Sequence, residues 1–143
     1  MIIKSITCLL LYYGFARYLP CSYSPFLGNL STKIRRFLCK RIFKHMGVNC
    51  NVERMAYFGN GKDVVLGDNS GIGINAHIYN NTIIGNDVMM APNVYFLQSG
   101  HIFARTDIPM CKQGVVTESS ILIIEDDCSI GQDVLVMGSK TIK

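Results

Sequence analysis

A bulky apolar residue returns at every sixth position through the middle of the chain. The series runs Leu66, Ile72, Ile78, Ile84, Met90 and Phe96. A smaller residue follows each of the first five, four positions later: Ser70, Ala76, Thr82, Val88 and Val94. Neither an α-helix, with a period of 3.6, nor an amphipathic strand, with a period of 2, generates this spacing. A hexapeptide β-helix repeat does, because each six-residue unit forms one short strand and one turn and points both residues inward.

The phase of this repeat predicts the coils and locates an interruption. Three hexads make one triangular coil, so we predict a coil over residues 66–83 and a looser one before it over 48–65. Glycine or Asn/Asp residues follow the bulky positions, where turns are expected. The register breaks after Phe96 and resumes out of phase at Ile124. We therefore predict an insertion at about 97–120 and expect a functional site there, since loops on rigid scaffolds carry sites.

Charge divides the chain into two parts. The first 52 residues contain eight lysines and arginines and no acid, whereas the remainder has ten acids and six bases. The repeat is therefore mildly acidic and lacks a basic stripe with interleaved aromatics, which argues against nucleic-acid binding. A basic helix is predicted over 31–46, with Ser31 as N-cap and Gly47 as stop. Two interpretations stay open: this helix covers the open end of the coil, or it lies on an anionic membrane surface.

The N-terminal 47 residues are expected to form a helical segment, followed by the β-helix over 48–143. The apolar stretch 6–16 suggests a signal peptide, but no small-residue cleavage site follows, and it is shorter than the ~20 residues that span a bilayer. We expect a packed helix there, with a membrane-surface element as the alternative. The six cysteines include no Cys-x-x-Cys pair, which favours free thiols in a reducing compartment. The prediction is a cytoplasmic protein, with the inner face of the membrane as a further location.

The insertion opens with Gln98-Ser99-Gly100-His101. A histidine at the base of a loop extruded from a rigid coil is well placed to act as a general base. Its unperturbed pKa of ~6.5 lets the imidazole accept and return a proton near neutral pH. His101 is therefore the first candidate catalytic residue.

Four motifs resemble one known family. They are the segments 66–75 and 84–92, the Gly-His pair ending at His101, and Thr-Asp-Ile-Pro at 106–109. Together they resemble the hexapeptide-repeat O-acetyltransferases, in the branch that modifies capsule and exopolysaccharide, related to the maltose and galactoside acetyltransferases. The N-terminal segments 10–16 and 23–26 are similar to the same branch.

The resemblance implies an all-β solenoid: a left-handed parallel β-helix with N-terminal helices and one extruded loop. It implies a homotrimer that binds acetyl-CoA between subunits and transfers the acetyl group to a sugar hydroxyl, in surface polysaccharide biosynthesis, without a metal. On this alignment His101 activates the acceptor hydroxyl, and Asn75 holds the acceptor or the tetrahedral intermediate. Gln132 matches a position that meets coenzyme A. From its own position, Asn75 is equally well an ordinary corner residue that tolerates an awkward turn.

Several departures keep other functions open. Ser129 stands where the family has a tryptophan, and Lys140 falls at an inward position where a buried charge is costly. Relatives continue beyond the position of Lys143 with a coil that contributes to the coenzyme A pocket. The alternatives are therefore a non-catalytic solenoid or assembly subunit, and an acetyltransferase acting on a drug or amino-sugar amine.

A zinc-dependent carbonic anhydrase is a further alternative, because some left-handed β-helices bind zinc through three histidines. His45, His77 and His101 would have to supply the ligands, and the pair of neighbouring histidines typical of such sites is absent from the sequence. We therefore expect no metal site.

Overall fold

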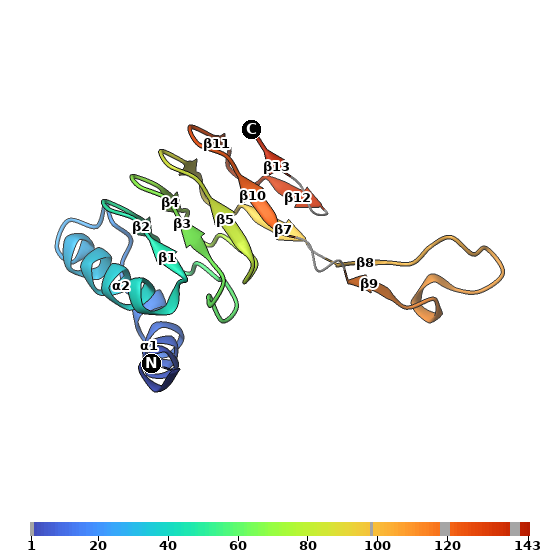
Figure 1. Ribbon diagram of the computed structural model, residues 1–143, viewed down its shortest axis with the longest axis horizontal. Coiled ribbons are helices and arrows are strands. Elements are labelled where there is room, and N and C mark those ends of the chain that lie inside the picture. Colours follow the sequence, from blue (N-terminus) through green and yellow to red (C-terminus); the bar gives the residue numbers. More distant parts are fainter. Residues whose placement is uncertain (1, 98, 118–120, 138–140) are drawn as a thin grey trace.

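Two helices stand at one end of a stack of short parallel strands (Figure 1). The computed structural model describes residues 2–97, 99–117, 121–137 and 141–143. Helix α1 (Ile2–Gly14), the 3-10 turn η1 (Ala16–Tyr18) and helix α2 (Gly28–Ile42) come first. The coil strands follow: β1 (His45–Met46), β2 (Asn51–Val52), β3 (Val65–Leu66), β4 (Gly71–Ile72), β5 (Thr82–Ile84), β6 (Met89–Met90), β7 (Tyr95–Leu97), β10 (Leu122–Ile124), β11 (Ser129–Ile130), β12 (Leu135–Met137) and β13 (Thr141–Ile142).

Each coil strand pairs in parallel with the equivalent strand of the next coil. One face is a five-stranded sheet in the order β1-β3-β5-β10-β13, and the other faces contain the pairs β2–β4, β6–β11 and β7–β12. Val65 lies opposite Ile83, 18 residues later, so three hexads make one coil as predicted. The coil before it is two residues longer, since His45 lies opposite Val65, and it therefore begins before Val48. Ile83 lies opposite Ile123, 40 residues later, which accommodates the insertion.

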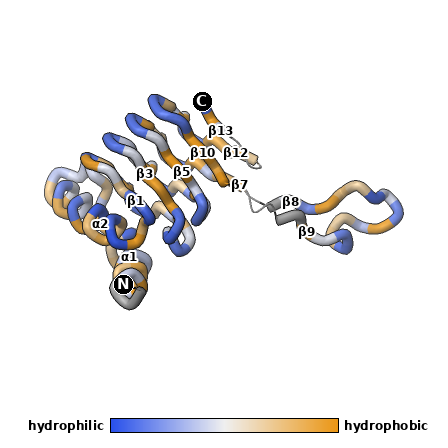
Figure 2. Tube along the Cα trace, viewed as in Figure 1, coloured by the Kyte–Doolittle hydropathy of each residue, from blue (hydrophilic) through white to orange (hydrophobic). Residues whose placement is uncertain are grey.

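The sixfold register is the hydrophobic core of the coil. Ten of the eleven predicted inward residues are buried, and Met90 is half-buried and packed against them. Val52, Phe58 and Val64 continue the same register into the first coil and are also fully buried. In Figure 2 the coil strands are coloured as hydrophobic and the corners as hydrophilic. A period of six therefore predicted which side chains fill the solenoid.

Most of the corner residues with positive φ are asparagine or aspartate. Asn69 and Asp87 have φ angles of 55° and 56°, in the left-handed region that these residues tolerate better than others. Gly67, two positions earlier, is needed for a different reason. A Cβ there would lie 2.4 Å from the backbone carbon of Gly85 in the next coil. The glycine thus permits close stacking of two coils.

Helix α2 lies across the first coil, as one of the two interpretations predicted. Its start and end were predicted wrongly. It begins at Gly28, because a Cβ there would lie 2.2 Å from the carbonyl oxygen of Ser22, and only glycine allows the connector to pass so closely. Ser31 is consequently a buried residue inside the helix, not its N-cap. The helix ends at Ile42, since Phe43 is already extended and leads into β1, so Gly47 is not its stop.

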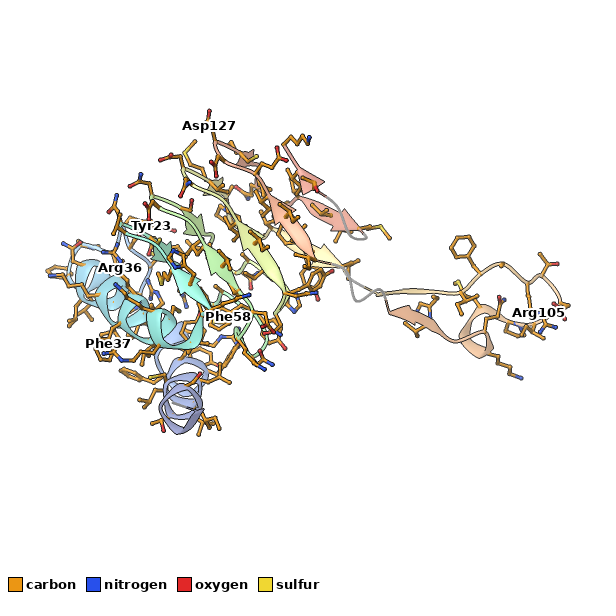
Figure 3. All side chains as sticks on the ribbon, viewed as in Figure 1. Tyr23, Arg36, Phe37, Phe58, Arg105 and Asp127 are labelled. Atoms are coloured by element: carbon orange, nitrogen blue, oxygen red, sulfur yellow. The ribbon has the colours of Figure 1, made fainter. Side chains whose placement is uncertain are left out.

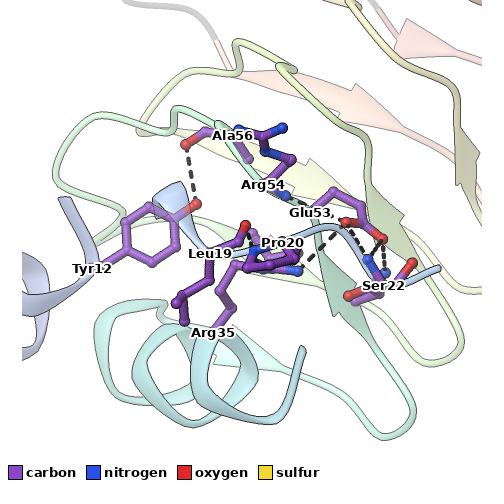
Figure 4. Close-up of polar contacts among 10 residues, drawn as sticks. Tyr12, Leu19, Pro20, Ser22, Arg35, Glu53, Arg54 and Ala56 are labelled. Carbon is purple, nitrogen blue, oxygen red and sulfur yellow. Dashed lines mark hydrogen bonds and ion pairs between the residues drawn. The ribbon is translucent and has the colours of Figure 1, made fainter. Parts of the chain in front are cut away.

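A buried guanidinium fastens α2 to the coil (Figure 4). Arg35 is fully buried and donates hydrogen bonds to the carbonyl oxygens of Val52 (2.6 Å) and Pro20 (2.9 Å). It also forms an ion pair with Glu53 at 3.5 Å. The carboxylate of Glu53 accepts hydrogen bonds from the backbone N–H of Ser22 and the amide of Asn51. Burial alone would raise the pKa of Glu53, but these hydrogen bonds and the Arg35 charge outweigh it and lower the pKa.

Helix α1 packs beside α2 and reaches the coil through its tyrosines. Tyr12 is fully buried and donates a hydrogen bond to the carbonyl oxygen of Ala56. Tyr13 donates to the carbonyl oxygen of Gly59. This confirms that the apolar N-terminal stretch forms a packed helix. No helix among the described residues is long and apolar enough to cross a membrane.

Candidate functional site

The predicted insertion is an antiparallel hairpin that projects from the coil (Figure 1). Its strands are β8 (Ser99–His101) and β9 (Val115–Thr117), and the 3-10 turn η2 (Met110–Lys112) lies between them. His101 lies opposite Val115, and both residues are exposed. The candidate base is therefore carried on an arm that extends away from the coil of its own chain.

Gln113 organises the far part of the hairpin. Its amide nitrogen donates to the carbonyl oxygens of Arg105 (2.7 Å) and Ile108 (2.9 Å), and its amide oxygen accepts the Arg105 N–H (3.1 Å). The Arg105 guanidinium, labelled in Figure 3 at the far end of the hairpin, pairs with the Asp107 carboxylate. The hydrogen bond from Arg105 lowers the pKa of Asp107. These hydrogen bonds and the ion pair link the residues of the arm to one another.

Asn75 is a corner residue of the coil and heads a row of polar side chains. It has a φ of 54°, and its amide donates to the Asn93 side-chain oxygen at 3.0 Å. The Asn93 amide donates in turn to the Asp133 carboxylate at 2.8 Å. Asn93 and Asp133 also have positive φ angles, of 60° and 59°. Asn75 is therefore a corner residue of the coil, as one of the two interpretations predicted.

Gln132 adjoins the same row. Its amide donates to the Asp133 carboxylate at 3.2 Å, and the side chain is exposed. Asn75 and Gln132, which lie 57 positions apart in the sequence, therefore stand on one corner and are linked through Asn93 and Asp133. We name Asn75, Asn93, Gln132 and Asp133 the corner row. The structure brings two of the three predicted site residues together, and it places His101 away from them.

An aromatic ladder lies next to the corner row. Tyr57, His77 and Tyr95 are opposite one another on successive coils, and their rings stack at centroid distances of 4.4 and 4.2 Å. His77 and Tyr95 each follow a corner-row asparagine by two positions. Burial lowers the pKa of His77, whose Nδ1 is buried without a hydrogen-bond partner. The register predicts an outward-facing turn residue at His77. It does lie between the inward, buried Ala76 and Ile78, but in a β-bridge rather than a turn, with its ring stacked between those of Tyr57 and Tyr95.

The three histidines do not converge within the chain. His45 lies on β1, His77 lies in the ladder, and His101 lies on the hairpin. No group of three or more His, Cys, Asp or Glu residues that could hold a metal ion occurs in the described ranges. Ser129, at the place of the family tryptophan, is an exposed residue of β11, whereas Lys140 lies outside the described residues.

Residues 63–98 match the family model described as bacterial transferase hexapeptide (six repeats). The chain carries the hexapeptide repeat of this transferase family. Its coil is a left-handed parallel β-helix with helices at the N-terminal end, which confirms the fold expected from the resemblance. No curated protein matches the hexapeptide-repeat chain by sequence.

Solved structures match nearly all of this hexapeptide-repeat chain. A galactoside acetyltransferase in complex with coenzyme A is 26% identical, with a TM-score of 0.69 over 96% of this chain. The present chain spans 64% of that protein, which is less than two thirds of its length. A maltose O-acetyltransferase from Clostridium difficile 630 is 20% identical, with a TM-score of 0.65, covering 98% of this chain and 69% of that one.

A third match shares the fold alone. AntD, an N-acyltransferase from Bacillus cereus in complex with dTDP-4-amino-4,6-dideoxyglucose and coenzyme A, is 16% identical, with a TM-score of 0.53. The matched parts cover 75% of the hexapeptide-repeat chain and 70% of AntD.

Sequence reasoning missed Gln113, Asn93, Asp133 and the ladder tyrosines. The spacing held a signal for most of them: Asn93 and Tyr95 follow Asn75 and His77 by 18 residues, the length of one coil. Gln113 had no comparable signal, because its contacts depend on the path of an irregular loop.

Proposed function

We propose that this chain is an acetyl-CoA-dependent O-acetyltransferase whose acceptor is a sugar hydroxyl in surface polysaccharide biosynthesis. The observation that supports it best is the interruption of the coil between β7 and β10 by a hairpin that carries His101. The likeness to a galactoside acetyltransferase solved with coenzyme A supports the choice of acyl donor.

In the proposed reaction the imidazole of His101 removes the proton of the acceptor hydroxyl. The hydroxyl oxygen attacks the thioester carbonyl carbon of acetyl-CoA and forms a tetrahedral intermediate. That intermediate collapses with cleavage of the carbon–sulfur bond. Coenzyme A leaves as a thiolate and takes the proton from His101, so the imidazole returns to its starting state. A general base is needed because an alcohol is a weak nucleophile at neutral pH.

The corner row supplies the second half of the proposed site. The side-chain amide of Asn75 donates one N–H to Asn93, and this hydrogen bond fixes the plane of the amide. In our proposal the second N–H of Asn75 donates to the oxyanion of the intermediate. Gln132 stands on the same corner, held by Asp133, and is assigned to contact with coenzyme A. A donor fixed in advance costs no reorganisation when charge develops in the transition state.

These two halves come from different chains in our proposal. His101 lies on an arm that extends away from its own coil (Figure 1), so it would meet the corner row of a neighbouring copy. A closed ring of three copies repeats this contact three times, because a head-to-tail interface generates a ring when its rotation closes. The proposed active form is therefore a homotrimer.

The function is tested by separating binding from transfer. Calorimetry should detect acetyl-CoA binding by the native chain, and mass spectrometry should detect acetyl transfer to galactoside or maltose acceptors. His101→Gln should abolish transfer and retain binding, whereas Gln132→Ala should weaken binding. His45→Gln changes an exposed histidine outside the proposed site and should alter neither. A native chain that binds no acetyl-CoA would overturn the enzymatic proposal and favour a non-catalytic solenoid.

A further inference from the structure

Helix α1 is apolar on both of its faces. One face buries Cys8 and Tyr12 against the rest of the molecule. The other face exposes Ile6, Leu10 and Leu11, with Leu10 70% exposed. No charged residue occurs anywhere between Lys4 and Arg17. A helix that is hydrophobic all round is normally covered, and a contiguous exposed patch of this kind marks an interaction surface.

The patch continues into a groove between the two helices. Its volume is about 430 Å³, and it is lined by Leu11, Phe15, Lys33, Ile34, Phe37 and Leu38. Phe15 and Phe37 are both more than half exposed, and Figure 3 labels Phe37 on the solvent side of α2. We name the exposed face of α1 together with this groove the helical patch.

Exposed cations lie on α2 beside the helical patch, and the first 52 residues of the chain contain no acid. Lys33, Lys40 and Arg41 lie on the exposed face of α2, and Lys44 follows the helix. Arg41 lies over the ring of Phe37, 3.5 Å from its centroid, which joins the cationic rim to the apolar floor.

The other cations of α2 are already used. Arg35 is buried in its ion pair with Glu53, and Arg36 donates to the carbonyl oxygen of Cys50 at 2.7 Å. The first acidic residue of the chain is Glu53, which faces Arg35. The structure thus divides the basic residues into two that fasten α2 to the coil and four that remain at the surface.

We propose that the helical patch docks on the surface of an anionic lipid bilayer. Leu10, Leu11 and Phe15 enter the boundary between headgroups and acyl chains, while the four surface cations meet lipid phosphates. An apolar face with a cationic rim is the combination that binds in the interfacial plane of a membrane. A second copy of the chain is a poorer occupant, because self-association through this patch would bring two cationic rims together without an acid to pair them.

This proposal changes the role of the basic helix. Helix α2 covers the coil with its inner face and, in this proposal, contributes cations to the lipid contact from its outer face. The lipid contact itself comes from α1 and the groove. The proposal does not depend on the acetyltransferase function.

The chain contains no tryptophan, so one introduced residue can report the contact. The full chain carrying Leu10→Trp should bind vesicles of phosphatidylcholine mixed with phosphatidylglycerol. The fluorescence emission of the introduced tryptophan should shift to the blue, and lipids brominated on the acyl chain should quench this fluorescence. The matched control is Met89→Trp, an equally exposed apolar position on β6 of the coil, which should show neither change.

A second set of variants tests the charges by vesicle co-sedimentation. Replacing Lys33, Lys40 and Lys44 with glutamine should weaken binding about fivefold per charge. Lys62→Gln, an exposed lysine at a coil corner, should leave binding unchanged. Equal binding to pure phosphatidylcholine vesicles would overturn the proposal. So would a Leu10→Trp blue shift that appears without vesicles and follows protein concentration, because it would assign the patch to protein association.

Discussion

The coil and the hairpin are stabilised by different kinds of interaction. Side chains of the coil are fixed from inside, since nearly every sixfold position is buried and each strand pairs with the next coil. The hairpin has exposed apolar residues at Phe103, Met110 and Val115 and is shaped by hydrogen bonds around Gln113. Packing therefore explains residue choice in the coil. Packing within the chain does not explain the exposed apolar residues of the hairpin.

The largest expected effect is on catalysis, through the hairpin. His101→Gln should lower the rate of acetyl transfer by a factor of about 10²–10⁴, the usual contribution of a general base. The thermal unfolding midpoint should stay unchanged, because the exposed imidazole packs against no core. Steady-state kinetics and calorimetric unfolding measure the two quantities. A variant that transfers acetyl at the native rate would remove His101 from the reaction.

The second-largest effect is expected on the free energy of unfolding, from a change in the core of the coil. Phe58 is fully buried and packs against the rings of Tyr12 and Phe43, at centroid distances of 4.6 and 4.8 Å. Phe58→Ala should reduce the free energy of unfolding by about 3–5 kcal/mol in urea denaturation. The matched hairpin variant, Phe103→Ala, removes a ring that is 79% exposed and should change it by less than about 0.5 kcal/mol. Similar losses from both would contradict the contrast between the two regions.

A smaller effect is expected where α2 joins the coil. Because the pKa of Glu53 is lowered in the folded state, its stabilising contribution is complete at neutral pH. It is lost as the pH falls below the usual glutamate pKa of about 4.3 and through the folded value. Glu53→Gln should lower the free energy of unfolding by about 2 kcal/mol at pH 7. It should also reduce the loss of stability at acid pH, because the variant has no carboxylate to protonate.

The control for Glu53 is another glutamate with an ion pair. Glu125→Gln breaks an exposed contact with Lys143 at 3.8 Å and should cost no more than about 0.5 kcal/mol. Urea unfolding at several pH values distinguishes the two variants. If the free energy of unfolding of Glu53→Gln fell with decreasing pH as steeply as that of the native chain, the buried pair would not control this pH dependence.

The smallest effect is expected in the corner row. Asn93→Gly keeps the positive φ and loses two side-chain hydrogen bonds, so it should cost about 1 kcal/mol. Asn93→Ala should cost about 1 kcal/mol more, because an alanine is strained in the left-handed region. Equal stabilities of the two variants would mean that the backbone angle is not what the asparagine provides.

The coil was easier to predict from the sequence than the helix ends or the corner row. A period of six predicted the buried positions, the coil length and the place of the interruption, because inward packing imposes one residue type at one spacing. The start of α2 was missed because it depends on how closely the connector at Ser22 passes Gly28, and the path of a connector has no periodic signal in the sequence. His101 was identified by its place at the break in the register, whereas the corner row needed the coils to be aligned by the 18-residue offset.

In the proposed trimer each site combines the hairpin of one chain with the corner row of another, and mixing two inactive variants examines this arrangement. His101→Gln and Asn75→Ala chains, each inactive alone, are unfolded together in equal amounts and refolded. Random assembly makes about three quarters of the trimers mixed, and each mixed trimer holds one intact site of three. About a quarter of the native rate of acetyl transfer should therefore be recovered. A mixture as inactive as either variant alone would contradict this arrangement.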